Sequence, residues 1–314
     1  MPPEPAIEAF GLSKSFAGRR AVEELTFAVQ PGEVFGLLGP NGAGKTTTLR
    51  MLAGLFAPDA GRARVAGCEV SSGKPASAEL RRRVGLLTEQ PGFYDRLDAE
   101  ENLAHFGGLY GVPAREARTR SRKLLERLGL AGHAKKPFAA LSRGMKQKLA
   151  IARALLHEPS VLLLDEPTVG LDPEATREVR AIISELRAEG RTTVLCTHDL
   201  DEVERLCSRA AFVATRLLAV HSVEAVRARR LRVELAAPCE SAAAVLRALP
   251  AVRSVRDEGA RLLLELSADD AAPDAVAALV QAGARVAAVV PERDPLEEAY
   301  LTLLAEARAR GLST

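Results

Sequence analysis

An eight-residue stretch, Gly39-Pro-Asn-Gly-Ala-Gly-Lys-Thr46, narrows the choice of fold more than any other part of this sequence. It matches the pattern G-x-x-x-x-G-K-[ST], whose glycines let consecutive backbone N–H groups point inward at phosphate oxygens. An apolar run, Val34–Leu38, precedes it, and a helical pattern begins at about Lys45. A buried strand, a glycine-rich loop and a helix in this order predict an α/β fold with a phosphate site at the N-terminus of the helix.

Two side chains of this stretch carry defined chemistry. We expect Lys45 to place its charge against the β- and γ-phosphates and Thr46 to offer its hydroxyl to Mg²⁺. The following helix directs the positive end of its dipole at the same anion. The predicted nucleotide-binding residues of this segment are Gly39, Pro40, Asn41, Gly42, Ala43, Gly44, Lys45, Thr46 and Thr47.

A second apolar run, Val161-Leu-Leu-Leu, ends in two carboxylates, Asp165 and Glu166. Burying an unpaired charge is costly, so acids placed directly after a buried strand call for an explanation. The phosphate loop in the same chain favours Asp165 as a ligand of Mg²⁺ and Glu166 as the general base for an attacking water. The alternative is an ordinary strand end with two solvated acids.

His198 follows another predicted strand, Thr192–Thr197. Ligands of open parallel sheets collect beyond the carboxyl ends of the strands, so an imidazole at this place reaches toward the γ-phosphate. A single histidine at a strand end is more often structural, but its position in the order of the motifs favours a catalytic role. Ser142 is a suitable N-cap for the next predicted helix, and Gly144 lets a phosphate approach the backbone.

The order of these motifs resembles that of ABC ATPases over about Ala6 to Arg230. It consists of the phosphate loop, L-S-x-G at Leu141–Gly144, V-L-L-L-D-E, G-L-D at Gly170–Asp172, and T-H-D. The resemblance implies an antiparallel β subdomain, ATP with Mg²⁺ as cofactors, and a dimer in which the L-S-x-G segment of one subunit closes over the ATP of the other.

The resemblance also implies two further roles. Phe16 matches the aromatic residue that stacks on adenine, with plain core packing as the alternative. Asp172 matches the loop that communicates between subunits.

Three departures from the family pattern stand out. The signature segment carries Arg143 where glycine is usual and Met145 where glutamine is usual, while Ser142 and Gly144 keep their places. Glu89 stands where a glutamine normally contacts Mg²⁺ and couples to the membrane subunit. The segment 212–226 lacks the usual glycine-containing turn between two strands.

Three explanations of Glu89 remain open at this point. In the first, its carboxylate adds a ligand to Mg²⁺. In the second, which we favour, the carboxylate repels the γ-phosphate and slows basal turnover, because close charges in a partly dry site interact strongly. In the third, neighbouring Gln90 supplies the amide and Glu89 faces solvent.

Length and pattern together favour two domains in the 314 residues. Strands alternating with helices predict a mostly parallel sheet, and an all-helical stretch at about 97–157 predicts an inserted subdomain. From Leu231 onward the pattern changes to β-α-β-β-α-β, which predicts a small ferredoxin-like α+β domain. The expected domains are 1–230, the ATPase core, and 231–314, an accessory domain.

Composition limits the partners. Lys and Arg number 43 against 41 Asp and Glu, so no nucleic acid is expected as main partner. The chain start lacks the features of a signal peptide, and no apolar run approaches the roughly 20 residues that span a bilayer. Four widely separated cysteines predict neither a zinc site nor a disulfide framework. We expect a cytoplasmic protein that serves the inner face of a membrane through another subunit.

The signature L-S-R-G-M-K-Q, the segment E-Q-P-G-F-Y-D-R-L and the closing D-P-L-E-E-A-Y-L-T-L are most similar to ATPase subunits of drug and polysaccharide exporters. The expected function is therefore a motor that hydrolyses ATP, as a homodimer or heterodimer, to drive a separately encoded permease. The alternative is a soluble ABC ATPase acting as a switch on ribosomes or DNA, which the single domain and the lack of heptads and of a basic tail disfavour. The cargo and the direction of transport are left open.

Overall fold

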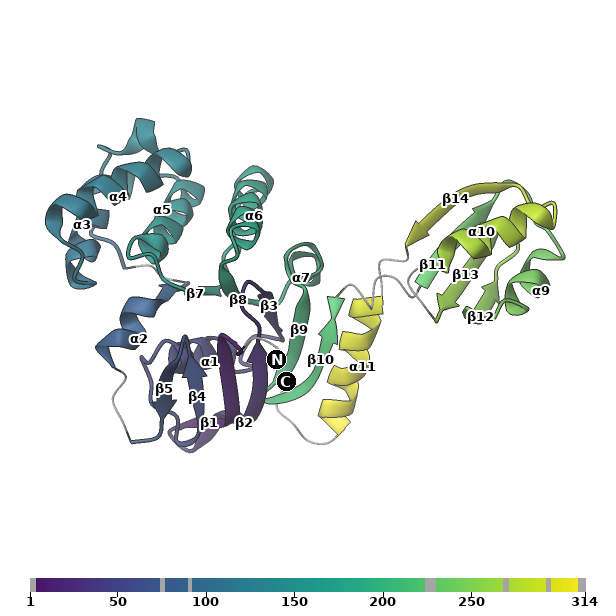
Figure 1. Ribbon diagram of the computed structural model, residues 1–314, viewed down its shortest axis with the longest axis horizontal. Helices are drawn as coiled ribbons and strands as arrows, with labels where there is room; N and C mark the ends of the chain where they lie inside the picture. Colours follow the sequence, from purple (N-terminus) through teal and green to yellow (C-terminus); the bar gives the residue numbers. More distant parts are fainter. Residues whose placement is uncertain are drawn as a thin grey trace. The chain divides into compact units, whose positions relative to one another are not determined.

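The computed structural model of this chain describes residues 4–73, 77–89, 92–223, 230–267, 271–291 and 295–309. They form two compact units (Figure 1), which are described separately below. The first runs to Val220 and takes in the end of the last helix from Glu306, and the second is His221–Ala305. The division at 230/231 expected from the sequence stays a prediction.

A six-stranded sheet in the order β10-β9-β3-β8-β7-β6 forms the centre of the first unit. Within it β9, β3, β8, β7 and β6 run parallel. All residues of β3, β7 and β8 are buried, which explains their nearly continuous apolar runs. The six strands are β3 (Val34–Leu38), β6 (Val84–Leu87), β7 (Val161–Asp165), β8 (Thr192–Thr197), β9 (Arg209–Ala214) and β10 (Arg216–Ser222).

A four-stranded antiparallel sheet, in the order β2-β1-β4-β5, lies beside the central sheet. Its strands are β1 (Ile7–Phe16), β2 (Arg19–Val29), β4 (Ala60–Val65) and β5 (Cys68–Ser71). The sequence predicts a turn around Gly18, and the structure confirms it between β1 and β2. Strands β4 and β5 were not predicted, although Ala66 and Gly67, both at positive φ, form the two-residue connection typical of a tight hairpin.

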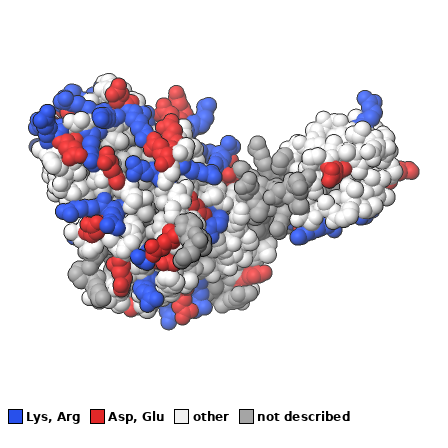
Figure 2. Space-filling view, in the orientation of Figure 1, with Lys and Arg blue, Asp and Glu red and all other residues white. Residues whose placement is uncertain are grey.

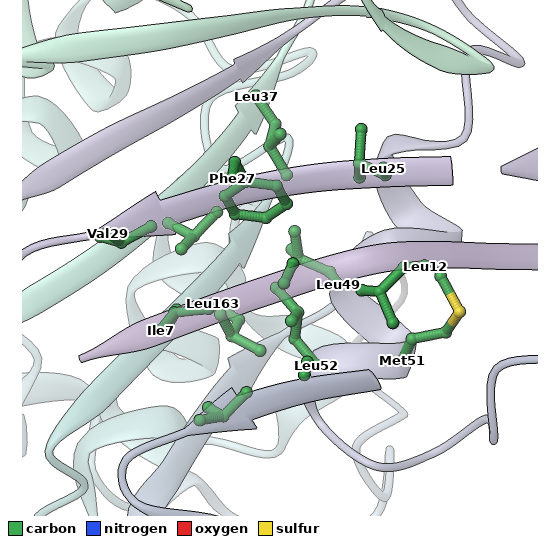
Figure 3. Close-up of a cluster of buried hydrophobic side chains, with 14 of the residues drawn as sticks. Ile7, Leu12, Leu25, Phe27, Val29, Leu37, Leu49, Met51, Leu52 and Leu163 are labelled. Carbon is green, nitrogen blue, oxygen red and sulfur yellow. The ribbon is translucent and has the colours of Figure 1, made fainter. Parts of the chain in front are cut away.

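Helix α1 (Lys45–Leu52) packs between the two sheets. Leu49, Met51 and Leu52 are fully buried, and they point into a cluster with residues of β1 and β2 and with Leu37 and Leu163 of the central sheet (Figure 3). Burying one such leucine contributes about 2–3 kcal/mol. This packing fixes the start of α1, and therefore the phosphate loop before it, relative to both sheets.

The helical part of the first unit matches the predicted all-helical insertion. Helices α3 (Ala99–Leu109), α4 (Ala114–Arg127) and α5 (Arg143–Leu155) follow one another, with short 3₁₀ turns at Ala131–His133 and Phe138–Ala140. Side-chain caps define the starts of α3 and α5, where Asp98 accepts from the N–H of Glu101 and Ser142 accepts from that of Met145. The remaining helices of this unit are α2 (Ala78–Arg83), α6 (Pro173–Ala188) and α7 (Leu200–Leu206).

The spacing of Asp199 and Glu202, three residues on, predicts a capping box at the start of α7 (Leu200–Leu206), and this prediction is wrong. Asp199 does cap α7, where it accepts from the backbone N–H of Asp201. Glu202 does not complete a capping box, because its side chain turns into the protein and accepts a hydrogen bond from Thr168. The hydrogen bond from the Thr168 hydroxyl therefore replaces the bond to the helix backbone that a capping box would make.

The missing glycine between β9 and β10 is replaced by Thr215. This residue takes the left-handed conformation itself, with φ at 59°. Its N–H donates to the carbonyl of Ala43 at 3.0 Å, and its carbonyl accepts from the N–H of Glu23 at 2.8 Å. The turn therefore joins the phosphate loop to β2. Residues 224–226 of the segment discussed above lie outside the described residues.

The second unit contains the predicted elements in the predicted order. They are β11 (Arg230–Leu235), α9 (Ala242–Arg247), β12 (Val252–Asp257), β13 (Arg261–Leu266), α10 (Ala272–Gln281) and β14 (Val286–Pro291), followed by α11 (Pro295–Ala309). The sheet is antiparallel in the order β12-β13-β11-β14. Val233, Leu264 and Leu279 are among the buried residues of a separate core. Ferredoxin-like remains our interpretation of this order.

Basic and acidic side chains are interspersed on the face shown in Figure 2. This mixture agrees with the nearly balanced composition of the chain. Among the helices of the described residues, none has both the length and the hydrophobicity required to cross a bilayer. The α/β core, with its mixed sheet, antiparallel sheet and helical insertion, confirms the fold class predicted from the sequence.

The packing of α1 gives a first prediction. Leu49 is fully buried, so Leu49→Ala is expected to lower the free energy of unfolding of the first unit by about 2–5 kcal/mol through lost contacts and a cavity. Leu55→Ala is the control, since Leu55 is 54% exposed and its change should stay within about 0.5 kcal/mol. Urea unfolding followed by circular dichroism measures both. Equal stability of the two variants would contradict the role given to α1.

Candidate nucleotide-binding and hydrolysis site

The phosphate loop connects β3 to α1, and close backbone contacts require its glycines. Gly44 has φ at 92°, and a Cβ atom there would lie 2.3 Å from the carbonyl oxygen of Ala21 in β2. A Cβ at Gly39 would lie 2.2 Å from the carbonyl oxygen of Val213 in β9. Glycine at these positions lets the loop pack closely against both sheets.

Lys45 is buried and folds back over the loop. Its Nζ donates to the carbonyl oxygens of Gly39 at 2.6 Å and Pro40 at 3.2 Å. The same Nζ lies 3.5 Å from Oε1 of Glu166. A buried ammonium group requires such partners.

Thr46 and Asp165 meet across the gap between α1 and β7. The Thr46 hydroxyl donates to Oδ1 of Asp165 at 3.1 Å. Burial raises the pKa of Asp165, and the hydrogen bond from Thr46 opposes that shift. A hydroxyl and a buried carboxylate beside a phosphate loop are hard oxygen donors, so these two residues fit Mg²⁺.

Glu166 sits at the end of β7 in a conformation that a non-glycine residue rarely adopts, with φ at 47°. Its N–H donates to the carbonyl of Cys196 in β8 at 2.9 Å, which holds this backbone in place. Both carboxylate oxygens lie 3.0 Å from Nδ1 of His198. Because one carboxylate contacts both Lys45 and His198, the three predicted catalytic side chains form one cluster.

A cavity of about 530 Å³ lies over this cluster. That volume is in the range of small-molecule sites. It brings together most residues predicted for nucleotide binding and catalysis, together with four neighbours that the sequence did not indicate, Arg19, Arg20, Ala21 and Val169. Its lining is Phe16, Arg19, Arg20, Ala21, Pro40, Asn41, Gly42, Ala43, Gly44, Lys45, Thr46, Thr47, Glu89, Glu166, Val169 and His198.

Phe16 lies at the rim of this cavity and is 43% exposed. Its ring meets that of Phe56 edge-on, with centroids 5.5 Å apart. The Nζ of Lys14 lies 5.7 Å from the ring centroid. The exposure does not agree with plain core packing, and stacking on adenine stays a prediction.

The signature residues lie elsewhere in the chain, at the first turn of α5. Ser142 uses its hydroxyl as the N-cap, accepting from the N–H of Met145 at 3.3 Å. Asp172 caps α6 in the same manner, accepting from the N–H of Ala175 at 2.8 Å. None of the four signature residues nor Asp172 is among the described residues lining the cavity over the phosphate loop. Their roles across a dimer remain predictions.

Glu89 lines two neighbouring cavities. The first lies over the phosphate loop, and the second, of about 370 Å³, is also lined by Arg143, Gln147, Glu166 and Val169. The side chain is exposed. Gln90, the alternative for the amide role, lies outside the described residues, so the choice between the two stays open.

Glu202 is a residue of this region that sequence reasoning assigned to a helix cap. It is 1% exposed, and its Oε1 accepts from the Thr168 hydroxyl at 2.9 Å. Burial raises the pKa of Glu202, opposed by hydrogen bonds from Thr197 and Thr168 and by Arg180, whereas Asp199 adds to the rise. The carboxyl group links α7 to the segment that follows Glu166.

The phosphate loop and the carboxylates at neighbouring strand ends define a nucleotide-binding domain of the phosphate-loop ATPase class. Residues 22–169 match the ABC transporter family. The chain is 45% identical over 216 residues to the Nod factor export ATP-binding protein I of Paraburkholderia xenovorans (strain LB400), covering 67% of this chain and 68% of that protein. It therefore belongs to the ABC transporter ATP-binding family, as the motifs predicted, and is an ABC-type ATPase.

Two further similarities extend over different lengths. The daunorubicin resistance ATP-binding protein DrrA3 of Streptomyces coeruleorubidus is 38% identical over 310 residues, with 96% of this chain and 97% of that protein covered. Among solved structures, CbiO1 from Clostridium perfringens, part of the ABC transporter complex CbiONQ, is 28% identical with a TM-score of 0.64. That match covers 71% of this chain and 91% of the other.

The buried carboxyl group gives a prediction about pH. The pKa of Glu202 is raised in the folded state above 4.5, so the folded protein holds this proton more tightly and loses stability as pH rises above 4.5. Glu202→Gln keeps the acceptor for Thr168 and removes the ionisable group. Its free energy of unfolding should therefore rise relative to wild type as the pH increases above 4.5, and level off once the pH passes the folded-state pKa of Glu202.

Glu202→Ala is the matched control. It removes the acceptor and leaves the Thr168 hydroxyl without this partner, which should cost about 1–3 kcal/mol. Urea unfolding of the nucleotide-free proteins across this pH range measures all three. A stability difference between Glu202→Gln and wild type that does not change with pH would contradict the assignment.

Proposed function

We propose that this chain is the ATP-hydrolysing motor subunit of an exporter, acting on a separately encoded membrane permease. The observation that carries the proposal is the cluster at one cavity, in which Glu166 lies within 3.5 Å of Lys45 and 3.0 Å of His198. Thr46 and Asp165 join at its edge. These groups can bind a triphosphate, hold a divalent cation and activate a water.

In the proposed mechanism, two copies, or this chain and a related one, bind MgATP between them. Lys45 leaves the carbonyls of its own loop and binds β- and γ-phosphate oxygens. Glu166 accepts the proton of the attacking water, and His198 holds the carboxylate in position and faces the γ-phosphate. Thr46 and Asp165 would hold Mg²⁺, which would supply positive charge to the phosphates. The signature segment of the second subunit completes the site.

Export as the task follows from the names of the relatives. One is a Nod factor export protein and another a daunorubicin resistance protein, and the second matches along nearly all of both chains. A permease partner and a peripheral position on the inner face of the cell membrane belong to the same proposal. The alternative of a soluble switch on ribosomes or DNA is not favoured, since the relatives named above are transport or resistance proteins.

The first test concerns the chemical step. Lys45→Ala removes the cation that binds the phosphates and should abolish ATP binding. Glu166→Gln should bind ATP as wild type does, hydrolyse it at least about 10²-fold more slowly through loss of the general base, and accumulate as an ATP-stabilised dimer. Nucleotide binding, phosphate release and size-exclusion chromatography measure the three properties.

The conservative exchange His198→Gln provides a graded comparison. It keeps a hydrogen-bonding side chain near Glu166 and should slow turnover less than Glu166→Gln does. Near-normal turnover by Glu166→Gln would refute the role of this carboxylate as general base.

The second test concerns Glu89. A carboxylate in the cavity that holds the triphosphate repels the γ-phosphate, and it accepts but cannot donate hydrogen bonds. We expect Glu89→Gln to raise the basal ATPase rate of the isolated chain several-fold, since about 1 kcal/mol of relieved repulsion corresponds to a factor of about five.

Gln90→Ala is the matched variant in this experiment. An unaffected rate in Gln90→Ala beside a faster Glu89→Gln supports repulsion by Glu89. A rate that falls only in Gln90→Ala assigns the amide role to Gln90 and contradicts the expectation for Glu89.

A further inference from the structure

The segment that follows Glu166 leads directly to Asp172 and lies against the start of α5. Its backbone turns are tight: the N–H of Val169 donates to the carbonyl of Glu166 at 3.3 Å, and that of Leu171 donates to the carbonyl of Thr168 at 3.2 Å. Val169 lines both the cavity over the phosphate loop and the neighbouring one. The position of this short segment therefore affects both the hydrolysis site and the loop at Asp172.

Arg143 contacts this segment directly. Its Nη2 donates to the carbonyl oxygen of Val169 at 3.1 Å. A Cβ atom at Gly170 would lie 2.3–2.5 Å from Nη2, Cζ and Nη1 of the same side chain. Because these three distances are nearly equal, the flat guanidinium group lies face-on over the Cα of Gly170. A glycine at position 143 has no atoms to make either contact.

Two other residues of α5 support the same contact. One helical turn after Arg143, Nε2 of Gln147 donates to the carbonyl oxygen of Pro167 at 2.7 Å. Gly144 permits the close approach of α6, since a Cβ there would lie 2.7 Å from the Cβ of Ala175. The first turns of α5 thus bind two carbonyl groups of the segment. Gln147 binds that of Pro167, and Arg143 binds that of Val169, which is nearer to Asp172 in the sequence.

We propose that Arg143 is a positioning residue that fixes the segment from Glu166 to Asp172 onto the first turn of α5 in the same subunit. The signature helix and the segment then move as one body when the dimer closes. This inference rests on the proposed function for its consequence in turnover, but the contact itself is made within a single chain. A cation that instead acted on the ATP of a second subunit would leave the segment of an isolated chain unaffected.

The test is amide hydrogen exchange on the nucleotide-free full chain. In Arg143→Ala, the amides of Val169 and Leu171 are expected to exchange about tenfold faster, because the segment loses a charge-assisted hydrogen bond and the packing over Gly170. Arg143→Lys keeps the charge without the planar group, and should give an intermediate rate. Steady-state ATPase should show kcat lowered about three- to tenfold in Arg143→Ala, with the KM for ATP changed less than about twofold.

Lys148→Ala is the matched control on the same helix. The Nζ of Lys148 pairs with Oε2 of Glu178 in α6 at 3.0 Å, so this side chain is directed to a different neighbour of α5. The variant should leave the exchange of Val169 and Leu171 at the wild-type rate. Faster exchange in this control as well would attribute the effect to general loosening of α5 and overturn the proposal.

A double mutant tests the contact over Gly170. Gly170→Ala introduces a Cβ where the guanidinium lies, so it should speed exchange more in the wild-type background than in Arg143→Ala, where only the strain of a positive φ remains. Equal effects of Gly170→Ala in both backgrounds would overturn the face-on contact.

The exchange and kinetic results separate this inference from the proposed function. Wild-type exchange rates in nucleotide-free Arg143→Ala, combined with loss of the ATP-stabilised dimer in a Glu166→Gln background, would overturn the intrasubunit role and assign Arg143 to the partner's nucleotide. A chain without measurable ATPase activity would contradict the proposed function, while faster exchange in Arg143→Ala would still establish the contact.

Discussion

The burial of α1 between two sheets is the constraint on which the site depends. A loop that presents its N–H groups to an anion gains little from its own contacts, so its rigidity has to come from the elements it joins. Leu49 and Leu52 anchor the helix on one side of the loop, and the carbonyls of Ala21 and Val213 press on its glycines. The same arrangement places Lys45 and Thr46 on the first turn, beside the strand ends that carry the acids.

Electrostatics explains why these residues cluster before a nucleotide binds. The Lys45 side chain is 6% exposed, and its ammonium group is held by two carbonyls of its own loop and by Glu166. Asp165 is 2% exposed and bonded to Thr46. Each group therefore already has partners that a phosphate or a cation can replace. In the proposed function, binding would exchange one set of polar contacts for another without leaving a buried charge unpaired, so the site would stay preorganised.

The sequence predicted those parts of the fold that depend on local pattern. The continuous apolar runs at Val34–Leu38 and Val161–Leu164 predict strands correctly, because strands that are buried on both faces have this pattern. Asp172 and Ser142 are recognisable as caps because their side chains bond to backbone N–H groups a few residues further on. Strands β4 and β5 were not predicted, because their alternation of buried and exposed residues is short and the strands are largely exposed. The parts that failed depend on distant contacts. No rule based on local sequence could predict that the Glu202 side chain leaves the helix cap and accepts a hydrogen bond from Thr168, 34 residues away in the sequence.

The departures at positions 89 and 143 are better understood together than singly. In the family resemblance, Glu89 or its neighbour Gln90 stands where an amide is usual, and Arg143 stands where the usual residue, glycine, has no side chain. Glu89 and Arg143 line the same cavity of about 370 Å³, together with Glu166. Arg143 therefore adds a cation to a cavity that two carboxylates also line. The segment after Glu166 is then held from two directions, by Arg143 on the side of α5 and by Glu202 on the side of α7. Both α5 and α7 therefore contact the segment that follows Glu166, and in the proposed function this segment would follow the motion of either helix.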